Sequence, residues 1–150
     1  MRLEVIDETA RFRRPETLAH ALAVLGAELG VGAERELTVV LVDDDTIAAM
    51  NQADRDVAGP TDVLAYPLHE SDDVGVPIVA PLGDIFISLD TAERQAAEHA
   101  LEGWQEVLVL AAHALTHLLG HDHVDEAAWE PFRRAQARVL ELAPAGGPDV

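Results

Sequence analysis

The chain has 150 residues, of which 49% are hydrophobic and only 4% aromatic, so aliphatic side chains must fill a sizeable core. It contains no cysteine, which excludes disulfides and thiolate metal sites and leaves His, Asp and Glu as ligands for any metal. With 28 Asp and Glu against 10 Lys and Arg, the formal charge of −18 disfavours non-specific binding to nucleic acid, so an RNA substrate requires a local basic cleft.

The sequence also lacks the patterns of a membrane or exported protein. No run approaches the ~18 consecutive apolar residues that a membrane span needs. The N-terminus has no charged region followed by an apolar stretch, as a signal peptide would. We therefore expect a cytoplasmic protein with no membrane partner, and the length predicts a single domain over residues 1–150.

The first third of the chain predicts a strand, a helix and a second strand. Residues 2–7 alternate well enough for a strand. Pro15 can open a helix, in which leucines recur at helical spacing as far as Leu29. Residues 36–42 are β-branched and apolar, which is typical of a buried strand.

A short helix and a strand are predicted next. Asp45 or Thr46 can cap a helix that runs through Asn51. Residues 53–60 are predicted to form a polar loop, and residues 61–67 a short strand that Pro67 closes.

The following segment predicts a surface loop, a strand and a helix. Residues 69–81 contain Ser, Asp, Gly and two prolines, which favour a surface loop. Residues 83–88 predict another strand. Asp90 or Thr91 can then cap a helix that runs to about Leu101.

The last third is predicted to be helical. Gly103 separates the preceding helix from a long apolar helix over about residues 104–119, and Gly120 fits its C-terminal stop. Residues 125–142 predict a final amphipathic helix, and the tail is predicted to be frayed. Runs of strands followed by runs of helices favour an α+β fold over a strictly alternating α/β fold.

Three histidines in the segment HALTHLLGHDH predict a metal site at the end of the long helix. His113 and His117 are four residues apart, which places both rings on one helix face. Gly120 permits the positive φ that reverses the chain, so His123 can return to the same ion. Three neutral imidazoles leave a fourth position for water, which is typical of catalytic zinc. We therefore predict one Zn²⁺ ion held by these three residues.

The alternative is that these are partly buried helix histidines without a metal, but the triple spacing around a glycine favours the metal. A zinc protease of the HExxH type is disfavoured because Ala114 stands where the glutamate is needed. His121 is expected to point elsewhere. Asp122 is predicted either to orient a ligand imidazole or to stabilise the turn.

The same segment resembles the signature of the YbeY family of bacterial rRNA-maturation endoribonucleases, whose usual form is close to HGxLHLxGYDH. The segments LTVVLVDDDTIAAMN, PTDVLAYP and LGDIFISLDTAERQA are each similar to further family blocks, so the resemblance covers roughly residues 36–125. It implies an α+β fold with a small mixed β-sheet packed with helices. It also implies a single-strand-specific, metal-dependent endoribonuclease that acts in 16S rRNA 3′-end maturation and ribosome quality control.

The resemblance further implies partners and site residues. The expected partners are single-stranded rRNA and the small ribosomal subunit, with no DNA. His113, His117 and His123 match the family's metal ligands. Arg55 matches the family arginine that ends an NxxYR pattern and is implicated in activity, seen here from Asn51 to Arg55.

The sequence departs from the family pattern at several positions without losing a metal ligand. Asp54 replaces an aromatic residue, and Val57 stands where lysine is common, which removes one cation from a cleft that must hold phosphate. Ala114 replaces glycine, Thr116 replaces an aliphatic residue, and His121 replaces tyrosine.

These residues lead to a hypothesis of metal-assisted phosphodiester hydrolysis in which Arg55 contacts the phosphate through its planar guanidinium. The alternative for Arg55 alone is a surface arginine in a polar loop. One rival function is a ribosome-assembly binding factor whose metal is mainly structural. Another is a metal-dependent hydrolase with a small substrate. No general base is identified.

For a few other polar or aromatic residues, we expect structural roles rather than roles in the site. Asp84 or Ser88 can line the cleft, but hydrogen bonding within turns or strands is the expected role for both and for Asp62. Trp129 is expected to pack rather than to stack on bases. The run Asp43–Asp45 is expected to cap a helix rather than to bind magnesium.

Overall fold

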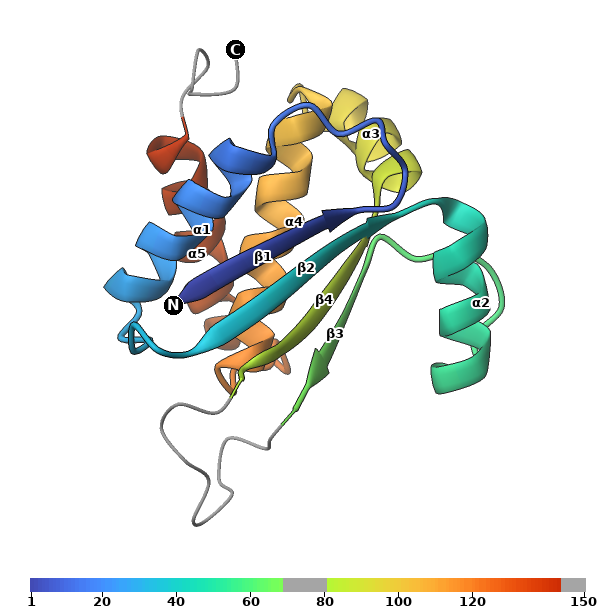
Figure 1. The fold of residues 1–150 in the computed structure, drawn as a ribbon. Coiled ribbons are helices and arrows are strands. Elements are labelled where there is room, and N and C mark those ends of the chain that lie inside the picture. The colour runs from blue at the N-terminus through green and yellow to red at the C-terminus, as the bar shows by residue number, and fades with distance from the viewer. Residues whose placement is uncertain (69–80, 144–150) are drawn as a thin grey trace.

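The computed structural model describes residues 1–68 and 81–143. The predicted surface loop and the predicted frayed tail therefore lie outside the described residues, apart from their first or last positions. Within these residues, a four-stranded sheet carries four helices on one face, and a fifth helix, α2, packs against the other face (Figure 1). None of the described helices is both long and apolar enough to cross a bilayer.

The sheet is small and mixed, as the resemblance implied. Its strands are β1 (Arg2–Asp7), β2 (Glu36–Val42), β3 (Val63–Pro67) and β4 (Gly83–Ser88), in the spatial order β1-β2-β4-β3. β1, β2 and β4 are parallel, and β3 pairs with β4 in the antiparallel direction. The predicted α+β fold class is confirmed. A single domain over residues 1–150 remains a prediction.

The helices on the first face bury the main core. Their bounds are α1 (Pro15–Glu28), α3 (Leu89–Glu98), α4 (Gly103–Leu118) and α5 (Glu130–Leu142). α4 lies at the centre, where it contacts α1, α3 and α5 as well as strands β3 and β4. Because α4 is packed on several sides, side chains on its remaining face are held in fixed positions.

The central strand β2 contributes to two cores because successive side chains of a strand point to opposite faces. Leu37, Val39 and Leu41 are buried with the four helices. Val40 and Val42 are buried on the other side, in a smaller cluster with α2. This smaller cluster holds α2 against the sheet, next to the edge strand β3.

The helix starts differ from the predicted caps. Helix α2 (Asp44–Arg55) is capped by Asp43, whose side chain accepts a hydrogen bond from the Thr46 backbone N–H at 2.8 Å. α3 is capped by Ser88 in the same way. Asp43 directly follows β2 and Ser88 is the last residue of β4, so each cap lies two or three residues before the later Asp and Thr candidates.

The last helix starts later than predicted. A 3₁₀ turn over Ala127–Trp129 comes before α5, which begins at Glu130. Pro131 explains the delay because its ring nitrogen cannot donate the hydrogen bond that a continuous helix from residue 125 would require. The turn brings Trp129 and the first turn of α5 next to the histidines.

Candidate metal centre

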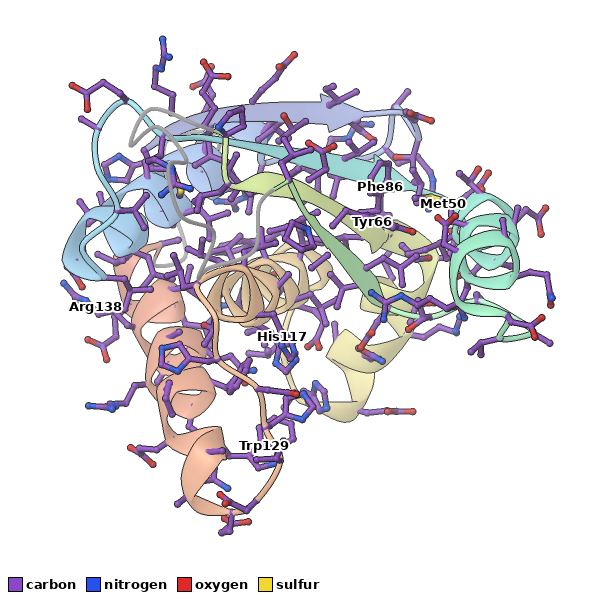
Figure 2. All side chains as sticks on the ribbon, turned by 90° about the horizontal axis from the view of Figure 1, so that it is seen from below. Met50, Tyr66, Phe86, His117, Trp129 and Arg138 are labelled. Carbon is purple, nitrogen blue, oxygen red and sulfur yellow. The ribbon has the colours of Figure 1, made fainter. Side chains whose placement is uncertain are left out.

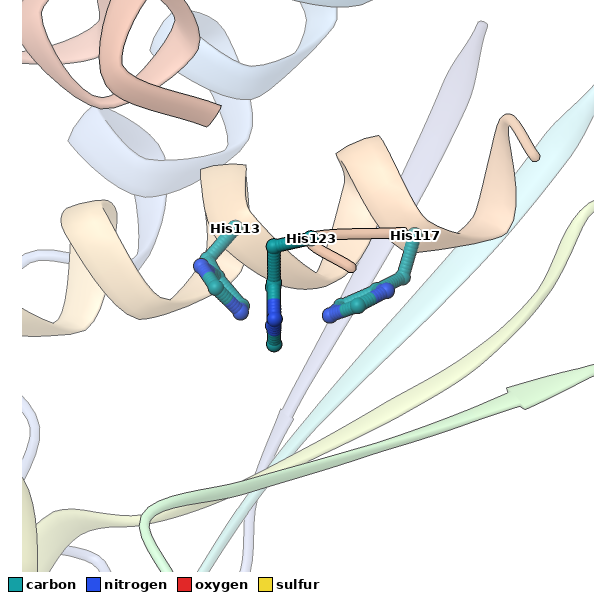
Figure 3. A group of neighbouring side chains, drawn as sticks. All are labelled: His113, His117 and His123. Carbon is teal, nitrogen blue, oxygen red and sulfur yellow. The ribbon is translucent and has the colours of Figure 1, made fainter. Parts of the chain in front are cut away.

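Helix α4 and the turn after it bring the three predicted histidines together (Figure 3). The ring centroids of His113 and His117 lie 4.9 Å apart, one helical turn along α4. Gly120 has φ 99°, a conformation that glycine adopts readily, and it turns the chain back. The ring centroid of His123 then lies 4.9 Å from that of His117 and 5.4 Å from that of His113.

The donor atoms of this cluster fit a single metal ion. One ring nitrogen from each of the three side chains lies within 4.8 Å of the other two, and all three rings are half-buried. Imidazole nitrogen is a preferred ligand of zinc and related divalent transition metals. The histidine cluster can therefore hold a metal ion, as the spacing predicted.

Hydrogen bonds to the Nδ1 atoms orient two of the rings. His117 Nδ1 lies 3.1 Å from the backbone oxygen of His121, which can only accept, so Nδ1 carries the proton and Nε2 is free to bind a metal. His113 Nδ1 lies 3.0 Å from the side-chain amide of Gln136 on α5. The atom that faces the ring is the amide nitrogen, which donates to Nδ1 and fixes the orientation of the His113 ring.

Two aromatic side chains support the three imidazoles. The Phe132 ring is fully buried, and its centroid lies 4.8 Å, 4.8 Å and 5.1 Å from those of His113, His117 and His123. The Trp129 ring stacks on His123 at 4.1 Å with an interplanar angle of 8°. Trp129 is in the segment that connects α4 to α5, and Figure 2 shows it on the same side of α4 as His117. Its expected packing role is confirmed, whereas Phe132 and Gln136 were not singled out from the sequence.

In the sequence, the residues that support the three imidazoles are marked only by their helical spacing. Trp129, Phe132 and Gln136 recur three and four residues apart, which places them on one face of the last helical segment. The spacing shows that they share a face, but it does not indicate that this face meets the histidines.

Burial keeps two of the histidines neutral. Burial, together with the neighbouring His117 and His123, lowers the pKa of His113 to about 4. Burial also lowers the pKa of His117. Neutral imidazole is the form that binds a metal, so these rings are available as ligands at neutral pH without first losing a proton.

A cleft of about 350 Å³ opens beside His113 and His117. Its other walls come from strand β3 and the segment before it, including Asp62, and from Arg55 at the end of α2. The Arg55 side chain is exposed and makes no hydrogen bond or ion pair with any residue in 1–68 or 81–143. The guanidinium is therefore free to contact an anion in the cleft.

The sequence predicted a polar loop over residues 53–60. In the structure, Arg55 is instead the last residue of α2. The end of α2 is fixed to the neighbouring segments by two hydrogen bonds: Tyr66 Oη donates to Asp54 Oδ2 at 2.7 Å, and Asn51 Nδ2 donates to the Gly59 oxygen at 3.0 Å. Burial and the bond to Asp54 raise the pKa of Tyr66 to about 12, so its hydroxyl keeps the proton that it donates.

The other polar candidates have structural roles. Ser88 Oγ is buried and donates to Asp44 Oδ1 at 2.6 Å. Asp122 Oδ1 accepts from the His123 backbone N–H at 2.9 Å, which favours the turn-stabilising alternative. Asp84 lies in β4, in register with Tyr66. Asp62 is different because it lines the cleft, although the sequence analysis gave it only a structural role.

Comparisons with known proteins agree with the site and the fold. A model of the Endoribonuclease YbeY family matches residues 4–143. A Thermus thermophilus protein named Endoribonuclease YbeY is 48% identical over 141 residues, covering 90% of this chain and 99% of its own length. A protein of the same name from Deinococcus radiodurans is 43% identical, covering 95% of this chain and 99% of its own length.

A solved structure has the same fold. The solution structure of a Thermotoga maritima protein superposes with a TM-score of 0.65 at 25% identity, covering 93% of this chain and 89% of the other. The family match runs from within β1 to the end of α5 and includes Arg55 and the three histidines. The chain therefore belongs to the YbeY family of endoribonucleases.

Proposed function

We propose that this protein is a metal-dependent endoribonuclease that cleaves single-stranded RNA, with His113, His117 and His123 as metal ligands and Arg55 as a catalytic residue. One observation carries the proposal: His113 and His117, two of three imidazoles that can share one cation, line a cleft whose other wall carries Arg55. The relatives in Thermus thermophilus and Deinococcus radiodurans bear the name endoribonuclease, which supports the same reaction.

The two walls supply different parts of the chemistry. A divalent cation bound to the histidines would polarise a phosphoryl oxygen and lower the pKa of a water molecule, so that phosphodiester hydrolysis can proceed at neutral pH. Arg55 presents several N–H donors in one plane, which matches two oxygens of a phosphate. It holds the phosphate beside the histidines and stabilises the charge that develops on the phosphate oxygens.

Charge explains why Arg55 is central to substrate binding. The chain as a whole carries a formal charge of −18 and repels a polyanion. Among the residues that line the cleft, Arg55 is the only lysine or arginine, and Asp62 is the only carboxylate. RNA binding should therefore be weak and salt-sensitive, and it should depend on the metal ion together with Arg55.

We further propose zinc as the metal, and 16S rRNA near its 3′ end as the substrate, with the small ribosomal subunit as the partner. Zinc follows from three imidazole ligands with room for a fourth position. The ribosomal substrate follows from family membership. A cytoplasmic location remains a prediction.

A degradation assay on single-stranded RNA tests the proposal. Wild-type protein, His113→Ala and Arg55→Ala would be compared, with a chelator added in parallel and the metal content of each sample measured. We expect cleavage by the wild type and its loss in the chelator. We also expect loss of metal and cleavage in His113→Ala, and loss of cleavage with full metal content in Arg55→Ala. Cleavage that survives both substitutions would come from a contaminating nuclease and would refute the enzymatic role.

The same samples also test the rival function. A ribosome-assembly factor with a structural metal would co-sediment with small ribosomal subunits, but none of its forms would cleave RNA. The free Arg55 beside the metal ligands does not favour this rival, because a purely structural metal does not need an unpaired cation in an open cleft.

A further inference from the structure

A second pocket adjoins the metal centre and has no role in the function proposed so far. It has a volume of about 450 Å³ and is lined by residues of α3, α4, α5 and the 3₁₀ turn before α5. It shares Asp62, Val63 and His113 with the cleft that contains Arg55. From His113 the Arg55 cleft extends along α4 toward Leu118, whereas the second pocket extends toward Glu106. A strand of RNA bound at the metal centre would therefore pass both.

The second pocket carries the opposite charge to the Arg55 cleft. It contains no lysine or arginine, and its walls include the carboxylates of Asp62, Glu98 and Glu106. Its floor is apolar and includes Leu110 and the side of Trp129. Such a pocket repels a phosphate but can accept a flat, uncharged ring that carries N–H donors.

A contact between the buried Glu106 carboxylate and the His99 ring forms one wall of this pocket. The Glu106 side chain is 1% exposed, and its carboxylate lies 2.9 Å from Nδ1 of His99, whose own side chain is 54% exposed. The bond to Glu106 raises the pKa of His99. A buried carboxylate is costly without such a partner, so the pair keeps the His99 ring in place at the pocket wall.

One carboxylate in the pocket is left without a partner. The Gln95 amide donates to Asp62 Oδ2 at 3.3 Å, and Glu106 is bonded to His99. Glu98 is exposed and makes no hydrogen bond or ion pair among the described residues. The Glu98 carboxylate is therefore an available acceptor in the pocket lining, whereas Asp62 and Glu106 already have hydrogen-bond partners.

We propose that this pocket binds one nucleobase of the RNA strand next to the cleaved phosphate, and that Glu98 makes it prefer a base with an exocyclic amino group. This inference rests on the proposed function. Bases of single-stranded RNA are unstacked and are read by hydrogen bonds along their edges and by contact with aromatic rings. A carboxylate accepts a hydrogen bond from the amino group of cytosine, whereas uracil presents an oxygen at the same position.

Cleavage of matched oligonucleotides tests the preference. Single-stranded RNAs that differ only by cytosine or uracil beside the cleaved bond would be compared, using the metal-loaded protein. We expect the wild type to cleave the cytosine substrate about tenfold faster, the size of effect that one good base contact gives. Glu98→Gln should lose most of this preference because an amide can both donate and accept.

Glu93→Gln is the matched control because Glu93 lies on the same helix, is exposed and loses the same charge, but does not line the pocket. It should keep the wild-type preference. The inference is overturned if cytosine and uracil substrates are cleaved equally by the wild type, or if Glu98→Gln keeps the preference unchanged.

A binding measurement separates this inference from the nuclease proposal. Trp104→Phe leaves Trp129 as the only tryptophan, and Trp129 lines the pocket. Titration with free cytidine should quench its fluorescence more strongly than uridine does, and Glu98→Gln should remove the difference. Equal quenching by the two nucleosides would refute the base site even if RNA is cleaved. A cytidine-specific response without RNA cleavage would instead refute the nuclease proposal alone.

Discussion

The two walls of the cleft are built in different ways. The histidine wall is half-buried, and its rings are held by Phe132, Trp129 and Gln136 from the α5 segment. The arginine wall is a single exposed side chain at the end of α2, positioned through neighbouring residues, and it has no hydrogen-bond or ion-pair partner among residues 1–68 and 81–143. The three imidazoles are thus preorganised at a cost in desolvation, whereas the Arg55 guanidinium keeps its conformational freedom.

The largest expected effect comes from removing the aromatic support of the histidine wall. Phe132→Ala deletes a fully buried ring that contacts all three imidazoles. We expect it to lower the free energy of unfolding by about 3–5 kcal/mol and to weaken zinc binding as well. Denaturant unfolding and zinc titration would measure both quantities. Phe132→Leu, as a milder change, should lose less of each, and unchanged zinc affinity in Phe132→Ala would show that the ring supports only the core.

A change to the arginine wall should affect catalysis without affecting stability. Arg55→Lys keeps the charge but loses the planar donor pair, so we expect the cleavage rate to fall about 10- to 100-fold. Zinc content and the midpoint of thermal unfolding should stay at the wild-type level because the side chain is exposed and unpaired. A loss of zinc in this variant would mean that the two walls are not independent.

The hydrogen bonds of Asp44 attach the start of α2 to α3, and their contribution to stability should depend on pH. Burial alone would raise the pKa of Asp44, but hydrogen bonds from Ser88, Thr91 and Arg94 outweigh it and hold the pKa below its usual value of 3.8. A lowered folded-state pKa contributes stability above pH 3.8, and this contribution is lost as the pH falls through the folded-state value.

Asp44→Asn should therefore lower the free energy of unfolding by about 1–2 kcal/mol at pH 7. The difference from wild type should shrink as the pH is lowered below 3.8. Denaturant unfolding at a series of pH values would measure it. Asp45→Asn is a suitable control because Asp45 is exposed on the same helix. A difference that is the same at pH 7 and pH 3 would contradict the electrostatic explanation.

The smallest effect is expected at the bond that positions Arg55. Tyr66→Phe removes the hydroxyl that donates to Asp54, so the end of α2 is held less firmly and cleavage should slow by only a few-fold. A double-mutant cycle with Arg55→Lys, which is expected to keep measurable cleavage, gives the test. If Tyr66 acts through Arg55, Tyr66→Phe should cost less in Arg55→Lys than in the wild type, and an additive loss would assign Tyr66 a separate role.

The contrast between the walls also explains what the sequence could predict. His113, His117 and His123 were found because their spacing and Gly120 are local features of the chain, and the structure confirms the cluster. The fold class followed from the order of apolar runs and glycine stops, and the small mixed sheet from the family resemblance. Arg55 was identified only through that resemblance, because nothing in its local sequence distinguishes it from a surface arginine.

The remaining parts of the site come from contacts between distant segments. Phe132 and Gln136 reach the histidines only because α5 packs against α4, and Asp62 faces the cleft because β3 lies beside α4. Hydrophobic periodicity indicates which face of a helix is buried, but not which partner it meets. The cap at Ser88 was missed for a similar reason, since several neighbouring residues were equally good capping candidates by type. For α2, Asp45 or Thr46 was named as the cap, although the run Asp43–Asp45 was also expected to cap a helix, and the structure shows that Asp43 does so.

The position of His123 has a consequence for the lifetime of the protein. This third ligand lies outside α4, on the short segment that connects it to α5, and its ring stacks on Trp129. An ion bound there would tie the connecting segment and the last helix to the body of the molecule, adding its binding free energy to that of folding. Molecules without a bound ion would open at this end first, so proteases would remove them sooner than metal-loaded ones.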